Sequence, residues 1–294
     1  MSNVLELKEV TKNYGDFKLD QVSFVVPEGC ICGFIGQNGA GKTTTIQLIL
    51  DSIRRDGGDI TVFGRDIRKE GPALKEDIGV VFDEMGFHDF MTPNDINRMM
   101  KYVYDNWDEE AFWGYLKRFS LPRKKKCGAF SRGMQMKLQI AAAMSHHAKL
   151  LLMDEPTSGL DPIVRNEILQ IFQEFVMEED HTVFLSSHIT GDIERIADMV
   201  VFIDHGQIVL QGNKDEILER HGLLKCKKAE FERMEAKDVV SSRQSAFGVE
   251  VLVKDREECR QKYPDMTVEQ TSLEEIMIFY VNDRFVMNGA KQGE

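Results

Sequence analysis

The sequence predicts an α/β protein built on a parallel β-sheet, with a helical insertion and a small appended α+β unit. Two observations predict this fold. Apolar β-type runs alternate with helical patterns along much of the chain, which favours a parallel sheet. Residues 30–35 are almost wholly apolar, as is typical of a strand buried on both faces. The chain has 294 residues, of which 42% are hydrophobic, so it can bury the core of one large domain or two modest ones.

The first part of the chain is expected to be rich in strands and then helical. The expected strands lie within residues 19–26, 30–35, 60–63 and 78–82. Thr92 then has the character of a helix N-cap, with Pro93 at the first helical position and Asp95 at the third. Apolar side chains recur at helical spacing as far as Trp107, and a second helix follows Asp108. These helices are expected to form an insertion between two halves of the α/β core.

Strands and helices alternate again in the second half of the chain. In order, we expect a helix after Ser131, a strand at 149–153, a helix after Asp161, a strand at 182–186, a helix at 192–198 and strands at 199–203 and 207–210. After about residue 222 the chain is more charged and less periodic, until a helix over 273–281. We therefore expect a first domain over 1–221, with a helical subdomain at about 84–148, and a small accessory domain over 222–294.

Charge and cysteine usage narrow the functional classes. The formal net charge is −12, which disfavours binding to nucleic acid, because phosphates attract basic surfaces. The chain has no apolar run of about 18 residues and no signal-peptide layout at its start, so a cytoplasmic location is expected. The cysteines lack the paired spacing of a disulfide framework or a zinc site, which favours a reducing compartment. They are Cys30, Cys32, Cys127, Cys226 and Cys259.

Residues 36–43 carry the strongest functional signal, the pattern GxxxxGK[ST] between a buried strand and a helix. Glycines let successive backbone N–H groups face one anion, and the positive end of the following helix adds to the attraction. Lys42 supplies a charge for the β- and γ-phosphates of a nucleotide, and the Thr43 hydroxyl can ligate Mg²⁺. The alternative is a glycine-rich turn that binds nothing.

A second part of the same site is expected at residues 150–155. A buried strand ends there in two carboxylates, which places Asp154 to hold the hydrated Mg²⁺ and Glu155 to polarise an attacking water. The alternative is a strand end whose acidic residues only cap the next turn.

The order of motifs over residues 1–221 resembles the nucleotide-binding subunit of ATP-binding cassette (ABC) transporters. The discriminating element is Phe130-Ser131-Arg132-Gly133-Met134, at the place of the family's LSGGQ signature. The resemblance implies a P-loop NTPase (RecA-like) core with an antiparallel β portion, an inserted α-helical subdomain and the C-terminal α+β extension. In the family, the signature serine and the following amides contact the γ-phosphate held by the opposite subunit. Arg132 replaces a glycine and Met134 replaces the glutamine, and Arg132 is expected to face solvent.

The resemblance also assigns residues to ATP, to catalysis and to Mg²⁺. For ATP binding they are Tyr14, Gly36, Asn38, Gly39, Ala40, Gly41, Lys42, Thr43 and Thr44; for catalysis Lys42, Ser131, Gly133, Glu155 and His188; for Mg²⁺ Thr43, Asp154 and Asp83. Tyr14 resembles the aromatic side chain that stacks on adenine, although a surface tyrosine before a turn would show the same pattern. His188 follows a β-type run, as the family's switch histidine does, and an imidazole there can hydrogen-bond the γ-phosphate.

One position breaks the family pattern inside the expected site. Asp83 follows the strand at 78–82, where the family usually has a glutamine that reaches Mg²⁺. Aspartate can also approach the metal, but it adds charge and is one methylene shorter, so we expect Asp83 near the site with altered metal geometry. This acidic residue and the altered signature resemble a bacterial exporter subgroup linked to multidrug, antibiotic-peptide and lantibiotic resistance.

The resemblance implies partners. One chain has one P-loop and one signature, so two copies are expected to form a head-to-tail dimer, with a homodimer favoured, around two ATP molecules. An integral membrane permease is expected to dock between core and insertion, around residues 83–100, and to hold the chain on the inner face of the plasma membrane. Exposed candidates for that groove are Met85, Phe87, His88 and Phe90, unless these side chains only pack the insertion.

Three alternatives stay open at this stage. The first is a regulatory ABC ATPase that does not itself drive transport, whose cassette would look the same. The second, an ATPase acting on ribosomes or DNA, is disfavoured by the single cassette and the acidic charge. The third concerns the basic run at 123–126, which could touch a partner or lipid headgroups but is more often a solvated loop.

Overall fold

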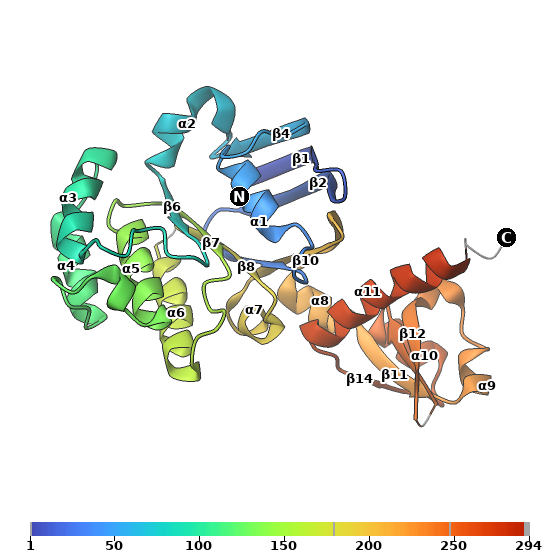
Figure 1. The fold of residues 1–294 in the computed structure, drawn as a ribbon. Coiled ribbons are helices and arrows are strands. Elements are labelled where there is room, and N and C mark those ends of the chain that lie inside the picture. The colour runs from blue at the N-terminus through green and yellow to red at the C-terminus, as the bar shows by residue number, and fades with distance from the viewer. Residues whose placement is uncertain (1, 179, 247, 291–294) are drawn as a thin grey trace. The chain divides into compact units, whose positions relative to one another are not determined.

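Figure 1 shows the computed structural model of the chain, which describes residues 2–178, 180–246 and 248–290, with side chains as far as Val281. Internal contacts divide the chain into two compact units, Met1–Gln211 and Gly212–Glu294. None of the helices in the described part of the chain combines the length and the apolar character that a membrane span requires.

The larger unit is centred on a six-stranded sheet with the strand order β10-β9-β3-β8-β7-β6. Its strands are β3 (Ile31–Ile35), β6 (Ile78–Val81), β7 (Leu150–Asp154), β8 (Thr182–Ser187), β9 (Met199–Asp204) and β10 (Gln207–Asn213). β3 runs parallel to β8 and β9, and β7 runs parallel to β6 and β8. Every residue of β3 and β7 is buried, which explains their apolar sequences. The expected α/β class is confirmed.

A second, antiparallel sheet has the order β2-β1-β4-β5. Its strands are β1 (Asn3–Asn13), β2 (Lys18–Pro27), β4 (Gly57–Val62) and β5 (Arg65–Asp66). Phe24 of β2 stacks on Phe184 of β8 with ring centroids 5.7 Å apart, and Phe34 of β3 lies 5.6 and 5.3 Å from them. The two sheets of the larger unit therefore share one core, and the second sheet is the antiparallel portion that the resemblance implied.

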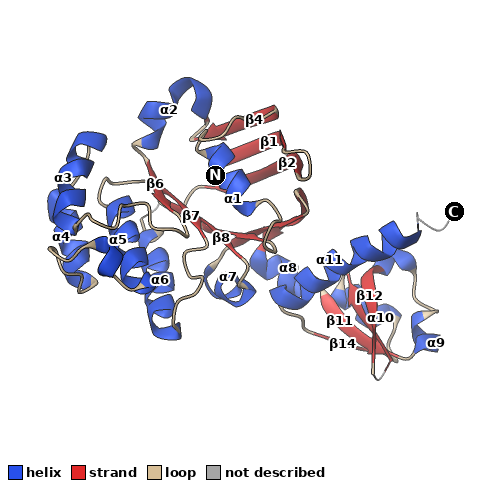
Figure 2. Cartoon of the chain, in the orientation of Figure 1, coloured by secondary structure: helices blue, strands red, loops and turns tan. Residues whose placement is uncertain are grey.

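Seven α-helices lie in the described part of the larger unit. They are α1 (Lys42–Ile49), α2 (Ile67–Lys75), α3 (Pro93–Val103), α4 (Glu109–Arg118), α5 (Arg132–Met144), α6 (Pro162–Phe175) and α7 (Thr190–Ile196), with a short 3₁₀ turn at Cys127–Ala129. α3 starts as the sequence predicted, because the Asp95 N–H donates to Thr92 Oγ1 and the Thr92 N–H donates to Asp95 Oδ2, at 3.3 and 2.9 Å. Figure 2 shows α3, α4 and α5 grouped at one end of this unit, away from β1, β2 and β4.

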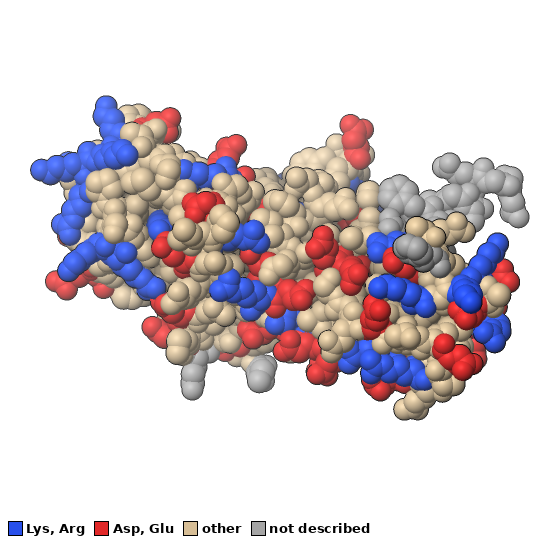
Figure 3. Space-filling view, turned by 90° about the horizontal axis from the view of Figure 1, so that it is seen from below, with Lys and Arg blue, Asp and Glu red and all other residues tan. Residues whose placement is uncertain are grey.

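The two helices of the insertion are joined through Glu109. Its carboxylate accepts hydrogen bonds from Asn97 Nδ2 at 2.9 Å and Trp113 Nε1 at 3.1 Å, and it is ion-paired with Lys101. The Lys101 ammonium, with these donors, lowers the pKa of Glu109 to about 2. Lys and Arg side chains gather at this end of the unit (Figure 3), where residues 123–126 are exposed and Arg123 lies over the Trp113 ring.

The smaller unit has its own antiparallel sheet, in the order β12-β13-β11-β14. Its elements are α8 (Lys214–Arg220), β11 (Gly222–Cys226), α9 (Lys228–Phe231), a 3₁₀ turn at Ala236–Asp238, β12 (Val239–Ser245), β13 (Gly248–Val253), α10 (Arg256–Lys262), β14 (Thr267–Glu269) and α11 (Leu273–Ala290). Its core contains Leu224, Val251 and Cys259.

The contact boundary before Gly212 precedes the domain boundary expected at 221/222. The reason is α8, which contacts α10, and His221, whose Nε2 lies 3.2 Å from the Tyr280 hydroxyl. The helix expected over 273–281 continues to Ala290. Residues 291–294 of the expected accessory domain lie outside the described residues, and the division into an ATPase domain and an accessory domain remains a prediction.

Candidate functional site

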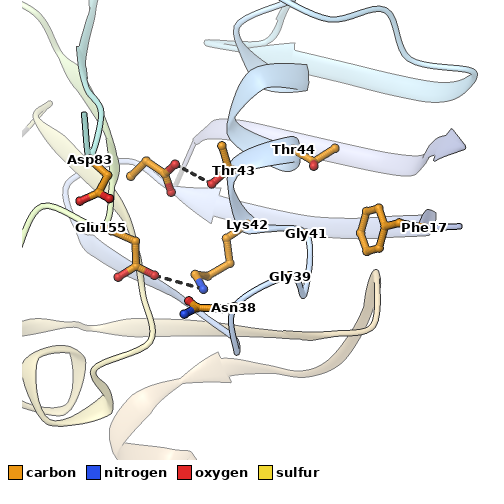
Figure 4. A pocket seen from close by; sticks show the side chains of 10 residues that line it. Phe17, Asn38, Gly39, Gly41, Lys42, Thr43, Thr44, Asp83 and Glu155 are labelled. Atoms are coloured by element: carbon orange, nitrogen blue, oxygen red, sulfur yellow. Dashed lines mark hydrogen bonds and ion pairs between the residues drawn. The ribbon is translucent and has the colours of Figure 1, made fainter. Parts of the chain in front are cut away.

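A cavity of about 480 Å³ opens beside the start of α1 in the larger unit (Figure 4). Its lining comes from the turn between β1 and β2, the loop after β3, the start of α1, and the residues at the ends of β6 and β7. The lining residues are Phe17, Asn38, Gly39, Gly41, Lys42, Thr43, Thr44, Asp83, Asp154 and Glu155. Most of the residues predicted for nucleotide and metal binding therefore meet in one cavity, because β3, β8 and β7 are parallel neighbours whose carboxyl ends share one edge of the sheet.

The loop at 36–43 needs its glycines for conformation and for space. Gly39 and Gly41 have φ of +82° and +115°, in the left-handed region that glycine adopts without steric cost. A Cβ on Gly36 would lie 2.6 Å from the main-chain oxygen of Ile203. Gly36 and Ala40 do not line the cavity, and Ala40 is buried with its N–H donating to Gln37 at 3.1 Å. These two residues shape the loop.

Lys42 lies folded back on its own loop and is ion-paired with Glu155. Its ammonium donates to the main-chain oxygens of Gly36 and Gln37 at 2.7 and 3.1 Å, and Nζ lies 3.1 Å from Glu155 Oε1. The Lys42 and Glu155 side chains are only 6% and 12% exposed, so water screens their attraction weakly. Figure 4 shows this ion pair as a dashed line across the cavity.

The opposite oxygen of Glu155 faces His188. Glu155 Oε2 lies 2.7 Å from His188 Nδ1, and the His188 N–H donates to the same oxygen at 3.3 Å. Glu155 itself has φ +51°, and its N–H donates to the Ser186 main-chain oxygen at 3.2 Å. His188 is not part of the cavity lining, but it is in contact with the carboxylate that is.

Asp154 and Thr43, both predicted to bind Mg²⁺, are joined by a hydrogen bond. The Thr43 hydroxyl donates to Asp154 Oδ2 at 2.6 Å, and the Ser186 hydroxyl donates to Asp154 Oδ1 at 2.5 Å. Sequence reasoning did not single out Ser186. Its only available signal was its place next to Ser187 and His188 at the end of a β-type run. Ser186 thus holds one oxygen of the Asp154 carboxylate, while the other oxygen, Oδ2, accepts the hydrogen bond from Thr43.

At the far end of the cavity the structure places Phe17 rather than Tyr14. Phe17 lines the cavity opposite Asp83 and Glu155 (Figure 4), whereas Tyr14 is not among the lining residues and is 52% exposed. Both belong to one turn, in which the Tyr14 N–H donates to the Phe17 carbonyl at 2.9 Å. The sequence analysis missed Phe17; the available signal was an apolar side chain in an otherwise polar turn.

Ser131 and Gly133 lie at the start of α5 and do not line this cavity. The Ser131 hydroxyl accepts a hydrogen bond from the Met134 N–H at 3.3 Å, so it caps the helix that was expected after it. A Cβ on Gly133 would lie 3.0 Å from Val164, which shows how closely α5 approaches α6 there. These two residues thus lie outside the lining of this cavity.

The sequence analysis expected Arg132 to face solvent, but the structure shows that its guanidinium contacts two loops. It is about half exposed, is ion-paired with Asp83 and donates to the Ser158 carbonyl at 2.8 Å. Asp83 lines the cavity as predicted, but its hydrogen-bond partner in this structure is Arg132. Binding of Mg²⁺ by Asp83 remains a prediction.

Comparisons with known proteins give matches to ABC transporter proteins. The family model described as "ABC transporter" matches residues 19–158. The bacitracin transport ATP-binding protein of Bacillus licheniformis is 34% identical over 224 residues, which cover 75% of this chain and 73% of the relative. The daunorubicin/doxorubicin resistance ATP-binding protein of Streptomyces peucetius is 31% identical, over 74% of this chain and 67% of the relative. A solved structure of the ATP-binding subunit of an ABC transporter has a TM-score of 0.66 and 27% identity, and the match covers 73% of this chain and 91% of that one.

Proposed function

Because the chain belongs to the ABC transporter family and is an ATP-hydrolysing transport ATPase, we propose that it powers export of a drug or antibiotic peptide through a separate membrane permease. The sequence analysis found a resemblance to exporters linked to multidrug and antibiotic-peptide resistance. Two relatives of the chain agree with it, because they are named for bacitracin transport and for daunorubicin and doxorubicin resistance. The observation that carries the proposal is the meeting of Lys42, Thr43, Asp154 and Glu155 at one cavity.

Thr43 and Asp154 suit a magnesium ion that arrives with the nucleotide. Hard hydroxyl and carboxylate oxygens are the ligands Mg²⁺ prefers, and in phosphate sites it takes one or two of them from the protein. When bound, the ion neutralises charge on the β- and γ-phosphates.

The chain's own residues then divide the remaining work. Lys42 exchanges Glu155 for the β- and γ-phosphates, which releases the carboxylate toward the attacking water. Glu155 accepts a proton from that water, and His188, 2.7 Å from its other oxygen, orients the carboxylate. Asn38, Gly39, Gly41 and Thr44 surround the phosphates. We retain Tyr14 as a candidate for the adenine and add Phe17, which lines the cavity.

Two copies complete each other's sites in this proposal. Ser131 and Gly133 lie outside the lining of their own cavity, which supports their service to the nucleotide of a second chain. Since one chain carries both an intact P-loop and this signature, a homodimer suffices. ATP favours the closed dimer only while the γ-phosphate that both chains contact is present.

Glu155→Gln tests the catalytic part of the proposal. It keeps the shape of the side chain but removes the base, so steady-state ATP hydrolysis should fall by about 100-fold or more. Bound ATP should persist and an ATP-dependent dimer should accumulate in gel filtration with saturating Mg²⁺ and ATP. The matched control is the double variant Glu155→Gln/Ser131→Ala, which should elute as a monomer. A Glu155→Gln chain that stays monomeric under these conditions contradicts the proposal.

The permease is proposed to dock on the loop after β6 and to hold the chain at the cytoplasmic face of the membrane. His88 and Phe90 support this, because their rings stack with centroids 5.3 Å apart and Phe90 is 69% exposed. Phe87 is half-buried and lines a cavity with Tyr104 and His146, so it packs the insertion instead. Purification of the native chain from detergent-solubilised membranes should recover an integral membrane protein with it. Recovery without one would favour a regulatory ATPase.

A further inference from the structure

Two of the residues that depart from the family pattern, Asp83 and Arg132, contact each other. Asp83 stands where the family usually has a glutamine, and Arg132 stands at a signature glycine. The Arg132 guanidinium is ion-paired with Asp83 Oδ1, and its Nε–H donates to the main-chain oxygen of Ser158 at 2.8 Å. A single side chain at the start of α5 therefore joins the loop after β6 to the loop after β7.

The loop after β7 leaves room for this side chain at Gly159. That residue has φ +68°, which favours glycine, and a Cβ there would lie 3.0 Å from Arg132 Nε and 3.4 Å from Arg132 Cδ. A larger residue at 159 would press on the guanidinium that bridges Asp83 and Ser158. The arrangement of Arg132 thus depends on two loops as well as on its own helix.

The cavity is lined mainly by acidic charges, so the ion pair between Arg132 and Asp83 affects how strongly the cavity attracts an anionic ligand. Asp83, Asp154 and Glu155 all line the cavity, and Lys42 is the single cation of the lining. An unpaired carboxylate at position 83 would repel a triphosphate, which carries several negative charges. Arg132 approaches Asp83 from outside the lining and offsets that charge.

We propose that Arg132 is a positioning residue for the nucleotide site, which neutralises Asp83 and so makes an acidic residue compatible with ATP at this position. The inference rests on the proposed function, because it presupposes that ATP occupies this cavity. The two side chains are 45% and 43% exposed, so the ion pair adds little to folding stability. Its effect is expected in nucleotide affinity.

A double-mutant cycle on the full-length chain tests the pairing. The variants are Arg132→Gln, Asp83→Asn and the two combined, and the measured quantity is the dissociation constant for ATP in EDTA, where no metal competes for Asp83. Arg132→Gln should weaken ATP binding about fivefold, because it leaves one negative charge unopposed beside the phosphates. The combined variant should return to within about twofold of the unmodified chain, since neither charge remains.

Two controls separate this effect from a structural one. Arg132→Lys keeps the charge and should bind ATP within about twofold of the unmodified chain. Lys137→Gln removes a cation from the same helix, but its partner Glu167 does not line the cavity, so ATP affinity should not change. The urea midpoints of all variants should agree with that of the unmodified chain.

The inference is overturned if Arg132 and Asp83 affect ATP affinity independently of each other. That result would be Arg132→Gln binding ATP as tightly as the unmodified chain, or the combined variant binding as weakly as Arg132→Gln alone. If the unmodified chain shows no affinity for ATP, the proposed function fails and the inference with it, so the two failures are distinguishable.

Discussion

The Glu155 carboxylate has a different neighbour on each oxygen, Lys42 at 3.1 Å and His188 at 2.7 Å. Phosphates that bind Lys42 must compete with this carboxylate, because both are anions and the ammonium is buried. In the proposed mechanism, nucleotide binding and release of the Glu155 carboxylate are therefore linked through Lys42. Lys42 was predictable because it belongs to the local motif at residues 36–43. Its ion pair with Glu155 was not, because the two residues are far apart in the sequence.

Phe17 and Tyr14 offer a prediction at the scale of single residues. Phe17 lines the cavity and Tyr14 is 52% exposed, so Phe17→Ala should raise the dissociation constant for ATP more than Tyr14→Ala does, by about fivefold against less than twofold. Titration of each variant with a fluorescent ATP analogue gives both values. If Tyr14→Ala carries the larger loss, the aromatic contact lies where the family resemblance placed it and the turn rearranges on binding.

Short sequence motifs predicted those candidate site residues that lie within a single loop or strand end. Thr43 and Asp154 belong to short motifs at the ends of buried strands, and the structure joins their side chains at 2.6 Å. Contacts between loops that are distant in the sequence left no comparable motif in the sequence. The ion pair of Asp83 with Arg132 was missed because each residue was judged alone, one as a possible metal ligand and the other as a solvent-facing cation.

At the scale of elements, the order β3-β8-β7 in the sheet creates the site. The loops that follow these three strands carry the P-loop, His188 and Glu155, and parallel pairing brings them to one edge. Strands of this kind were predictable, because burial on both faces leaves an apolar run. Their order was not, since periodicity carries no information on which strands are neighbours.

Three of the elements that the sequence analysis missed, α2, β1 and α8, break the periodic patterns for physical reasons. α2 contains Pro72 and is kinked at Glu70, whose φ and ψ of −121° and 17° are not helical. β1 shows register shifts against β2 and a positive φ at Glu9, so its buried residues do not alternate regularly. α8 has seven residues and one buried side chain, Ile217, which is too little for a helical pattern to be recognised.

The contact between α3 and α4 gives a prediction of pH dependence. The pKa of Glu109 is lowered from 4.5 to about 2 by Lys101 and by its hydrogen-bond donors. A lowered pKa adds stability above pH 4.5 that is lost as the pH falls toward 2. Glu109→Gln should therefore have a lower Tm than the unmodified chain at pH 6, and the difference should shrink between about pH 4.5 and 2.

Thermal unfolding followed by circular dichroism across that pH range measures the effect. Glu110→Gln, at the next position of α4, is the matched control and should show no such narrowing relative to the unmodified chain. A Tm difference for Glu109→Gln that stays constant from pH 6 to pH 2 would show that the carboxylate does not gain from its contacts in the folded insertion.

At the scale of the whole molecule, the proposed mechanism gives each chain half of two sites. The cavity proposed for the nucleotide is lined by Phe17, the P-loop and the residues that follow β6 and end β7, while Ser131 and Gly133 lie outside that lining. All the described lining residues belong to the larger unit. The composite site in a dimer, with Ser131 and Gly133 acting on the nucleotide of the other chain, is the central claim of the proposed mechanism.

Mixing two inactive variants tests that claim most directly. A Lys42→Ala chain has a defective P-loop and an intact signature, and a Ser131→Ala chain has the reverse, so each alone should hydrolyse ATP at a small fraction of the normal rate. In a mixed head-to-tail dimer, one of the two sites combines the intact P-loop of one chain with the intact signature of the other. The steady-state ATPase rate of an equimolar mixture should therefore rise well above the sum of the separate rates. A rate equal to that sum, with mixed dimers shown to be present, would contradict the claim.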